Sequence, residues 1–464
     1  MYRTPMLMLL LGFVVGCDRN EATAPRPRAL RPAMHEADPG PGADGPDLRS
    51  QNLKLLANLP RSEEVTQSDL AFDGRVAYAG NYHGVRVLDI ADPEHPAVVA
   101  DVECHGAQSD VSVYANLLFQ SVDQPQSSGL CTSHDFDTGD VVADMFEGIR
   151  IFDVSNPAAP VRIASVFTDC GSHTHTLVPD PANNRVLIYV SSYPRGLSLS
   201  FPSCTAAHGY VSLVEVPLAN PAAAHVLTNY QLDGNTQLTL LPGAAVPFRA
   251  CHDITVFLEL GLAAAACMSE VQLWNIKNPA QPTLTWRADH PAVSNPDGDI
   301  WHSAAFSWDG KVVAFGDESG GGAEARCTDP NDQHGRVWFF DVATGSILGS
   351  YKIPRVESGV CTIHNFNFVP LAGGRKVLVS AAYTGGTTIV DVDKLLAGAS
   401  AAAAEIAFNR PNGALPWSSY WYNGFVYAND MLRGLDVMLL SDKARASDRK
   451  LPSMNPQSQV TVIQ

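Results

Sequence analysis

The stretches GVRVLDIADP, residues 84–93, and GIRIFDVSNP, residues 148–157, are two copies of one pattern. Each copy begins with Gly, alternates apolar and polar residues, and ends with Asp or Asn followed by Pro. Alternation with a period of two predicts a half-buried β-strand, and the Asx-Pro pair predicts a turn directly after it. The repeated unit is therefore a strand that leads into a tight turn.

Five looser copies bring the number of units to seven: GYVSLVEVP (209–217), VQLWNIKNP (271–279), RVWFFDVATG (336–345), TTIVDV (387–392) and GLDVMLL (434–440). A strand-turn-strand segment precedes each copy, and a further short strand follows every copy except the last. Four strands in each of seven units predict an all-β fold, a seven-bladed β-propeller. The segment LKLLANL (53–59) has the character of the missing strand. We expect this N-terminal strand to close the last blade, because open strand edges invite aggregation.

The segments VRVLDIADP, IRIFDVSNP and TTIVDV resemble the repeats of the LVIVD-repeat proteins, a family of bacterial and archaeal predicted propellers. The resemblance covers about residues 53–442. It implies the same fold and no particular activity, since we know of no activity that the family shares.

The first 17 residues predict export. An apolar run from Met6 to Val15 is too short to span a bilayer, and Val14-Val15-Gly16-Cys17 resembles the lipobox of bacterial lipoproteins, in which the Cys is lipidated. An ordinary secretory signal with an incidental Cys is the alternative. The expected organisation is a signal peptide (1–17), a flexible tether (18–50), the propeller (51–442) and a C-terminal tail (443–464), anchored by lipid in the bacterial cell envelope.

The net charge of −17, from 31 basic and 48 acidic residues among 464, argues against nucleic acid as a partner. Phosphate contacts require clustered Lys and Arg, and no such cluster occurs in the sequence. The expected partners are the membrane, reached through the lipid anchor, and a small-molecule substrate, which the histidines described next indicate.

Histidine recurs at one position of the repeat. When the units are aligned, the residues that open the innermost strands are Ser68, Ser109, His175, His252, His302, His364 and Ser418. Innermost strands line the central channel of a propeller, so the four imidazoles are expected to converge at one mouth of it and to bind a metal ion. The alternative is that each ring binds channel water or backbone, or serves a metal-free substrate site.

Several nearby residues are candidates for further ligands or supporting contacts: His173, Asp253, Asp317 and Glu318. His173 lies two residues before His175 and is expected to share its face, although a loop role is the simpler interpretation. Strand alternation would turn Asp253 away from the channel. A set of imidazoles suits Fe(II) or Cu, which we favour over Zn, and does not suit Ca or Mg.

Eight cysteines remain after Cys17, an even number that predicts disulfides in an exported protein. Their places in the repeat predict four pairs at the mouth that carries the histidines: Cys104–Cys131, Cys170–Cys204, Cys251–Cys267 and Cys327–Cys361. In CHDITVF (251–257), Cys251 is then structural, and a hydrolytic Cys-His-Asp centre is excluded because successive strand residues face opposite sides. A thiolate ligand from Cys251 or Cys361 is the competing interpretation.

Two functions follow from these patterns. The first is a metal-dependent oxidase or oxygenase that acts on a small molecule at the four-His site. The arrangement is similar to the iron centre of carotenoid-cleaving oxygenases and to the metal-binding propellers of the selenium-binding and methanethiol oxidase family, although the sequence motifs of both are absent. The second is a non-catalytic surface propeller that binds a protein or glycan. Metal analysis of the purified protein separates the two functions.

Overall fold

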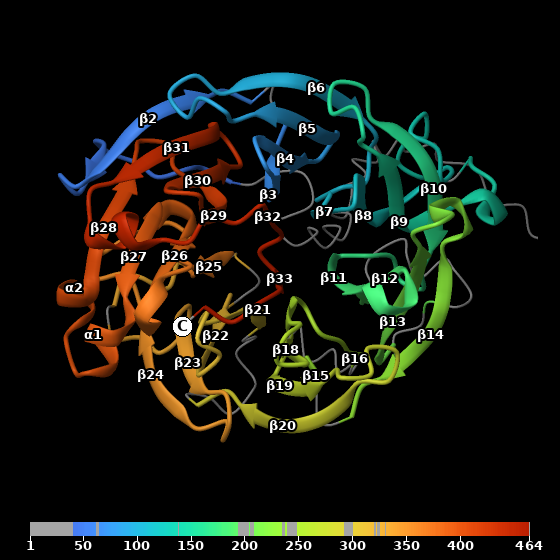
Figure 1. Cartoon of the computed structure of the whole chain (residues 1–464). Helices are drawn as coiled ribbons and strands as arrows, with labels where there is room; N and C mark the ends of the chain where they lie inside the picture. Colours follow the sequence, from blue (N-terminus) through green and yellow to red (C-terminus); the bar gives the residue numbers. More distant parts are fainter. Residues whose placement is uncertain are drawn as a thin grey trace, which may run out of the picture. The chain divides into compact units, whose positions relative to one another are not determined.

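The computed structural model describes residues 40–61, 65–137, 139–193, 204, 208–233, 237–238, 248–291, 300–319, 322, 325–329 and 331–463. Within these residues, seven antiparallel sheets are arranged in a ring (Figure 1). The chain is thus a seven-bladed β-propeller, as the repeats predict. Among the described residues, no helix has the length and apolar character needed to cross a membrane.

Each blade has four main strands, and the first of them lies nearest the axis (Figure 1). Blade 1 contains β3 (Gln67–Asp73), β4 (Val76–Asn81), β5 (Gly84–Asp89) and β6 (Ala97–Glu103), and blade 2 contains β7 (Val111–Tyr114), β8 (Leu117–Gln126), β9 (Phe146–Asp153) and β10 (Val161–Phe167). Blade 3 contains β11 (Thr174–Asp180), β12 (Arg185–Ser191), β13 (Tyr210–Pro217) and β14 (His225–Gln231). Blade 4 contains β17 (Ile254–Phe257), β18 (Leu262–Cys267), β19 (Glu270–Asn275) and β20 (Thr283–Asp289).

Blade 5 contains β21 (Trp301–Phe306), β22 (Val312–Asp317), β23 (Val337–Asp341) and β24 (Ile347–Tyr351). Blade 6 contains β25 (Phe366–Phe368), β26 (Val377–Ala381), β27 (Thr387–Asp391) and β28 (Glu405–Arg410). Blade 7 contains β29 (Pro416–Tyr422), β30 (Phe425–Asp430), β31 (Gly434–Leu440) and β2 (Leu53–Leu59). Two short helices, α1 (Val392–Leu396) and α2 (Ala401–Ala404), connect β27 to β28. The strands β15 (Gln237–Leu238) and β16 (Phe248–Arg249) form a separate two-stranded ribbon between blades 3 and 4 along the chain.

The blades share one shape, which follows from the residues of the repeat. Gly84 and Gly148 open third strands with φ of 144° and 134°, and a Cβ atom on either would lie within 2.2 Å of a carbonyl oxygen of the outer strand. Only glycine fits there without strain. At the other end of these strands, the Oδ1 atoms of Asp89 and Asp153 each accept a hydrogen bond from the backbone N–H two residues later, at 2.8 Å. These Asx turns end the strand and direct the chain to the outer strand.

The ring is closed by the N-terminal strand, as the sequence predicts. β2 pairs with β31, so the last blade takes its outer strand from the beginning of the propeller. A second closure, which the sequence did not predict, comes from β1 (Leu48–Arg49), which pairs with β28 at the outer edge of blade 6. Residues 40–50 thus include a segment that contacts the propeller, where Ala43 is buried and its N–H donates to the carbonyl of Ala414.

Apolar side chains fill the spaces between neighbouring blades. At the junction of blades 1 and 7, for example, the rings of Phe72 and Tyr422 stack with centroids 4.6 Å apart, and Leu70, Tyr420 and Leu435 are buried in the same cluster. Full burial of such a side chain contributes about 1.5 to 3 kcal/mol to stability. Packing between blades therefore determines how far the innermost strands stand from the axis.

The C-terminal segment crosses one mouth of the channel (Figure 1). After α3 (Lys443–Ser447), β32 (Ser453–Met454) pairs with the end of β3, and β33 (Ser458–Gln459) pairs with the end of β17. The Gln459 side chain completes the contact by exchanging two hydrogen bonds with the backbone of Phe306, at 2.9 and 3.2 Å. These contacts lie where inner strands end, so the opposite mouth, where inner strands begin, is the one that carries the histidines.

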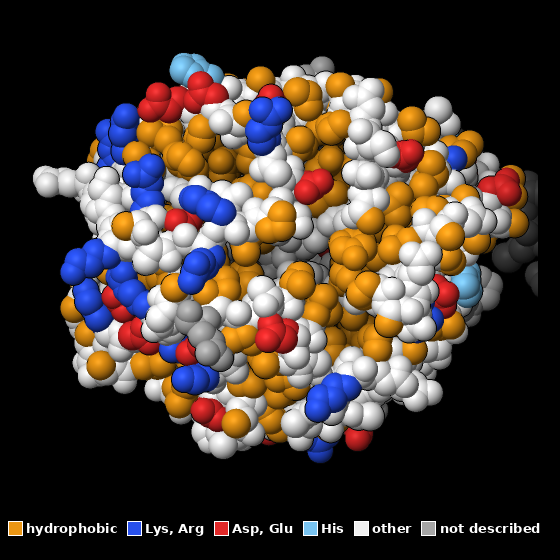
Figure 2. Space-filling view, viewed as in Figure 1, with side chains coloured by type: hydrophobic (Ala, Val, Ile, Leu, Met, Phe, Trp, Pro, Cys, Tyr) orange, Lys and Arg blue, Asp and Glu red, His pale blue; other side chains and the backbone are white. Residues whose placement is uncertain are grey.

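Lys and Arg side chains gather on one side of the surface seen in Figure 2. Blades 6 and 7 and α3 supply basic residues that are paired with carboxylates, among them Arg375 with Asp391 at 3.0 Å and Lys450 with Asp448 at 3.1 Å. The charge of these basic groups is thus matched locally.

Candidate metal centre

Three histidines lie in a row where the inner strands of blades 4, 5 and 6 begin. His252 precedes β17, His302 is the second residue of β21, and His364 precedes β25. The ring centroids of His252 and His302 are 3.8 Å apart, and those of His302 and His364 are 4.2 Å apart. All three side chains are buried. The structure thus brings together three of the four histidines that the repeat singles out.

Hydrogen bonds between neighbouring blades fix the backbone at each of these histidines. The Thr174 hydroxyl donates to the carbonyl of His252 at 2.9 Å, the Asp253 N–H donates to the carbonyl of His302 at 2.8 Å, and the Ser303 hydroxyl donates to the carbonyl of His364 at 2.8 Å. Each bond joins the residue after one axial position to the axial residue of the next blade. The backbone of the ring therefore places the histidines.

This series of bonds identifies His173, not His175, as the axial residue of blade 3, because Thr174 makes the inter-blade bond. The Nε2 atom of His173 lies 2.8 Å from Nε2 of His252. His175 instead lies within β11, with Nε2 2.5 Å from Ser112 Oγ and Nδ1 2.8 Å from Ser121 Oγ. Its ring therefore lies between blades 2 and 3, outside the row of histidines.

The Nδ1 atoms of three of these rings are held by oxygen acceptors. Nδ1 of His173 lies 2.8 Å from Asp123 Oδ2, Nδ1 of His252 lies 3.0 Å from Asp253 Oδ1, and Nδ1 of His364 lies 2.6 Å from the carbonyl oxygen of Trp417. The Asp123 carboxylate and the Trp417 carbonyl oxygen only accept, so Nδ1 carries the proton in the rings of His173 and His364. In the neutral imidazole, Nε2 then presents a lone pair, which is the arrangement found in metal-binding histidines.

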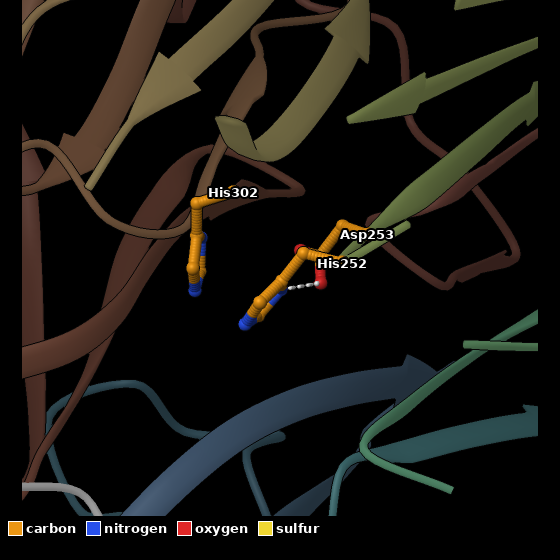
Figure 3. Close-up of side chains that lie close together, drawn as sticks. All are labelled: His252, Asp253 and His302. Carbon is orange, nitrogen blue, oxygen red and sulfur yellow. Dashed lines mark hydrogen bonds and ion pairs between the residues drawn. The ribbon is translucent and has the colours of Figure 1, made fainter. Parts of the chain in front are cut away.

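Two carboxylates lie within reach of these rings. Asp253 forms a compact group with His252 and His302, which Figure 3 shows side by side, and Glu318 forms a second group with His302 and His364. The ligand atoms within each group lie within 4.8 Å of one another. Glu318 Oε2 is 3.6 Å from His302 Nε2, and Glu318 Oε1 is 3.6 Å from His364 Nε2. Each group has the two-histidine, one-carboxylate composition that binds transition metals, including non-haem iron.

Aromatic side chains that the sequence did not single out surround the same centre. The Tyr383 hydroxyl donates to Glu318 Oε1 at 2.5 Å, and its ring lies 4.9 Å from that of His364. Burial, followed by the Glu318 charge, raises the pKa of Tyr383 well above its ordinary value, so this phenol keeps its proton. Tyr383 also has a positive φ of 43°, which is uncommon for a residue other than glycine.

Asp317, the remaining candidate, lies away from the histidine row. Its Oδ2 accepts a hydrogen bond from the Gly335 N–H at 2.8 Å and lies 3.3 Å from Nε2 of His290. Asp317 and Glu318 are neighbours at the end of β22, yet only Glu318 faces the centre. Cys17, the predicted site of lipidation, falls outside the described residues.

The eight other cysteines form four disulfides, Cys104–Cys131, Cys170–Cys204, Cys251–Cys267 and Cys327–Cys361, which are the pairs that the sequence predicts. Cys251 is therefore a structural neighbour of His252 and offers no free thiolate. Four disulfides indicate an oxidising, extracytoplasmic compartment.

A layer of buried carboxyl groups lies along the channel next to the histidines. Asp253 and Asp69 both line a small axial cavity. Burial, together with the nearby Asp110, raises the pKa of Asp69 to about 8, and burial raises the pKa of Asp253 well above its ordinary value. Strand alternation would point Asp253 away from the channel, and that expectation was wrong because β17 begins only at Ile254, so the alternation does not extend to Asp253.

Comparisons with known proteins support the fold and add no activity. No protein-family model matches the chain, and no curated protein matches it. The β-propeller domain of Cps50 (Swd1) from Myceliophteria thermophila matches with a TM-score of 0.51 and 10% identity, over 84% of this chain and 100% of that chain. The computationally designed protein Ika8 matches with a TM-score of 0.47 and 12% identity, over 83% of this chain and 99% of that chain. The likeness to Cps50 concerns the fold alone.

Proposed function

We propose that the histidine row binds one transition metal ion and that the protein is a metal-dependent oxidoreductase for a small molecule. The proposed ligands are the Nε2 atoms of His173, His252, His302 and His364, with Glu318 as the carboxylate. His173 takes the place that the sequence assigned to His175, because His173 contacts His252 and His175 faces serines.

The observation that carries the proposal is the contact between His173 and His252. When Nδ1 of each ring donates to its aspartate, the Nε2 atoms of the neutral rings carry lone pairs that face each other across 2.8 Å. Two lone pairs at that distance repel unless a proton or a metal ion lies between or beside them, and a metal ion is the occupant that we propose. Two ligands bound at about 2.1 Å and at right angles on one metal ion are separated by about 3 Å, close to the distance in the structure.

Fe(II) or Cu suits this centre better than Zn. Both ions accept several imidazoles, and a site of two histidines and one carboxylate with open positions is typical of non-haem iron oxygenases. Bound there, the ion would supply redox chemistry with dioxygen as oxidant. Glu318 would offset part of its charge, while Asp123, Asp253 and the Trp417 carbonyl would orient the ligand rings.

Metal analysis of protein purified without chelator tests the proposal. We expect about one Fe or Cu per chain in the wild type and less than a tenth of that in the double variant His252→Ala/His302→Ala. The matched control is His290→Gln, which alters a buried histidine beside Asp317 and should leave the metal content unchanged.

Two results would contradict the proposal. Wild-type protein without a bound transition metal would remove the centre and favour the non-catalytic propeller that binds a protein or glycan. A metal that stays in the double variant would place the ion elsewhere. If metal is bound as expected, the oxidoreductase assignment further requires substrate-dependent dioxygen uptake, measured with an oxygen electrode across reduced sulfur compounds, phenols and polyenes.

The setting of this activity is also a proposal. Membership of the LVIVD-repeat family rests on the repeated strand and turn, and lipid anchoring in the bacterial envelope rests on Cys17 and its preceding residues. The four disulfides support an extracytoplasmic site of action. Labelling with a radioactive fatty acid, compared between wild type and Cys17→Ala, tests the anchor.

A further inference from the structure

Tyr383 lies beside the histidine row and is not one of the proposed metal ligands. Its hydroxyl donates a hydrogen bond to Glu318 Oε1 at 2.5 Å, and both residues are 2% exposed. The carboxylate oxygens of Glu318 also lie 3.6 Å from Nε2 of His302 and 3.6 Å from Nε2 of His364. One buried carboxylate is therefore shared between a phenol and two of the proposed ligand rings.

The turn that carries Tyr383 is held by contacts on its own backbone. Thr384 donates two hydrogen bonds to the carbonyl oxygen of Val360, from its N–H at 2.8 Å and from its hydroxyl at 2.6 Å. The Gly386 N–H donates to the carbonyl oxygen of Tyr383 at 2.8 Å. Gly386 has φ of 75°, and a Cβ atom there would lie 2.2 Å from the carbonyl oxygen of Asn409, so glycine is required. These contacts maintain the positive φ at Tyr383, which persists only where the surrounding structure enforces it.

The ring of Tyr383 is confined as well. Its centroid lies 4.9 Å from that of His364, and the side chain belongs to a buried apolar cluster with Leu415, Trp417 and Met431. A hydrogen bond to a charged acceptor is stronger in such surroundings than in water. The bond to Glu318 is therefore strong, and its donor has little freedom to move away.

The bond also connects two blades at the centre. Glu318 directly follows β22 of blade 5, and Tyr383 lies in the segment between β26 and β27 of blade 6. A glutamate side chain without such a partner samples several rotamers, and ordering it when an ion binds costs free energy. A donor already fixed by blade 6 removes part of that cost, because it holds the carboxylate in one orientation before the ion arrives.

We propose that Tyr383 is a positioning residue of the metal centre, which holds the Glu318 carboxylate beside His302 and His364 and withdraws part of its negative charge. This inference rests on the proposed function, in which Glu318 is a ligand. Residues that orient a ligand typically change metal affinity by about 10- to 100-fold. Since a hydrogen bond lowers the charge that a carboxylate offers to an ion, Tyr383 should also favour the less positively charged oxidation state of the bound metal.

Metal affinity measured in a double-mutant cycle tests the proposal. Competition with a chromophoric chelator, with Cu(II) and anaerobically with Fe(II), gives the affinity of each variant. Tyr383→Phe removes only the hydroxyl and should weaken binding by at least about tenfold. Glu318→Ala should weaken binding at least as much. Adding Tyr383→Phe to Glu318→Ala should cause no further loss, because the group through which Tyr383 acts is then absent.

Tyr351→Phe is the matched control. Tyr351 is a fully buried tyrosine at the end of β24, and its hydroxyl donates to Glu405 Oε1 at 2.9 Å. This variant should lower the urea midpoint of the metal-free protein about as much as Tyr383→Phe does, yet bind both ions as wild type does. Redox titration of the Cu-loaded proteins gives a second measure, in which Tyr383→Phe alone should lower the midpoint potential. If Tyr383→Phe fails to fold, Thr384→Val loosens the same turn and should also weaken binding when Glu318 is present.

The proposal is overturned if Tyr383→Phe, or Thr384→Val in its place, binds both ions as tightly as wild type. It is also overturned if the losses of Tyr383→Phe and Glu318→Ala multiply in the double variant, since Tyr383 would then act independently of Glu318. A midpoint potential that stays constant or rises would refute the effect on charge. Wild-type protein that binds neither ion would refute the proposed function and this role together, whereas tight binding that ignores Tyr383→Phe would refute the role of Tyr383 alone.

Discussion

His173 and His175 provide the sharpest test of the metal centre, because they are two residues apart, both buried, and assigned different roles by the structure. The repeat pattern points to His175, whereas the inter-blade hydrogen bonds point to His173. We predict that His173→Gln weakens metal binding and that His175→Gln weakens only the fold. Each variant is the matched control of the other.

The expected magnitudes follow from the contacts of each ring. Loss of a residue that merely orients a ligand costs 10- to 100-fold in metal affinity, so loss of the His173 ligand itself should cost at least about 100-fold, or about 2.7 kcal/mol. The His175 ring makes hydrogen bonds to Ser112 and Ser121 and none to the histidine row. Leaving such buried groups poorly paired should lower the free energy of unfolding by about 1 to 3 kcal/mol.

Two measurements separate the outcomes. Competition with a chromophoric chelator, performed with Cu(II) and anaerobically with Fe(II), gives the affinity of each variant. Urea unfolding of the metal-free proteins gives their stability. If His175→Gln loses the metal while His173→Gln retains it, the inter-blade hydrogen bonds do not mark the metal ligand and the assignment of His173 is refuted. Equal losses in both variants would also refute it, since a local role for His173 requires a difference.

Three further predictions concern the rest of the propeller. Burial and the neighbouring charge of Asp436 raise the pKa of Asp430 to about 7. Between about pH 4 and 7 the folded state therefore binds one more proton than the unfolded state, and folding becomes less favourable as the pH rises. In urea unfolding, the stability of wild type relative to Asp430→Asn should fall as the pH rises through that range. Replacing Cys251 and Cys267 by Ala removes a disulfide that closes a short loop, which should lower the free energy of unfolding by about 3 kcal/mol. Metal analysis should still find the bound ion. Loss of the metal from a well-folded variant would instead support a thiolate ligand. Gln459→Ala should cost about 2 kcal/mol in urea unfolding because it removes two buried hydrogen bonds to Phe306, and an unchanged midpoint would show that these two bonds add nothing to stability.

The fold was predictable because its determinants are local and repeated. Glycine at the start of the third strand and Asx at its end are required by contacts within one blade, so each unit shows them in its own sequence. Closure by β2 was predictable for a similar reason, since the last unit lacked a strand and a matching segment preceded the first unit. The pairing of β1 with β28 has no such signal, because two residues are too few to show a period.

The centre was predictable only in part because its residues are brought together by packing between blades. His252, His302 and His364 follow the repeat, and the structure brings them together. In blade 3, the sequence His173-Thr174-His175 offers two histidines of the same spacing, and only contacts between blades distinguish them. Tyr383 and Asp123 lie in connecting segments or at strand positions with no repeat equivalent, so no pattern marked them.

The amino-acid sequence by itself determined the number of blades, the closing strand, the cysteine pairs and the kind of side chain at the axis, since each depends on which residues recur at which spacing. Only the tertiary structure decided which nitrogen atoms meet, which carboxylates face them and which oxygens line the axial cavity. The physical reason is that these contacts join residues from different blades, whose separation depends on the packing of every blade between them.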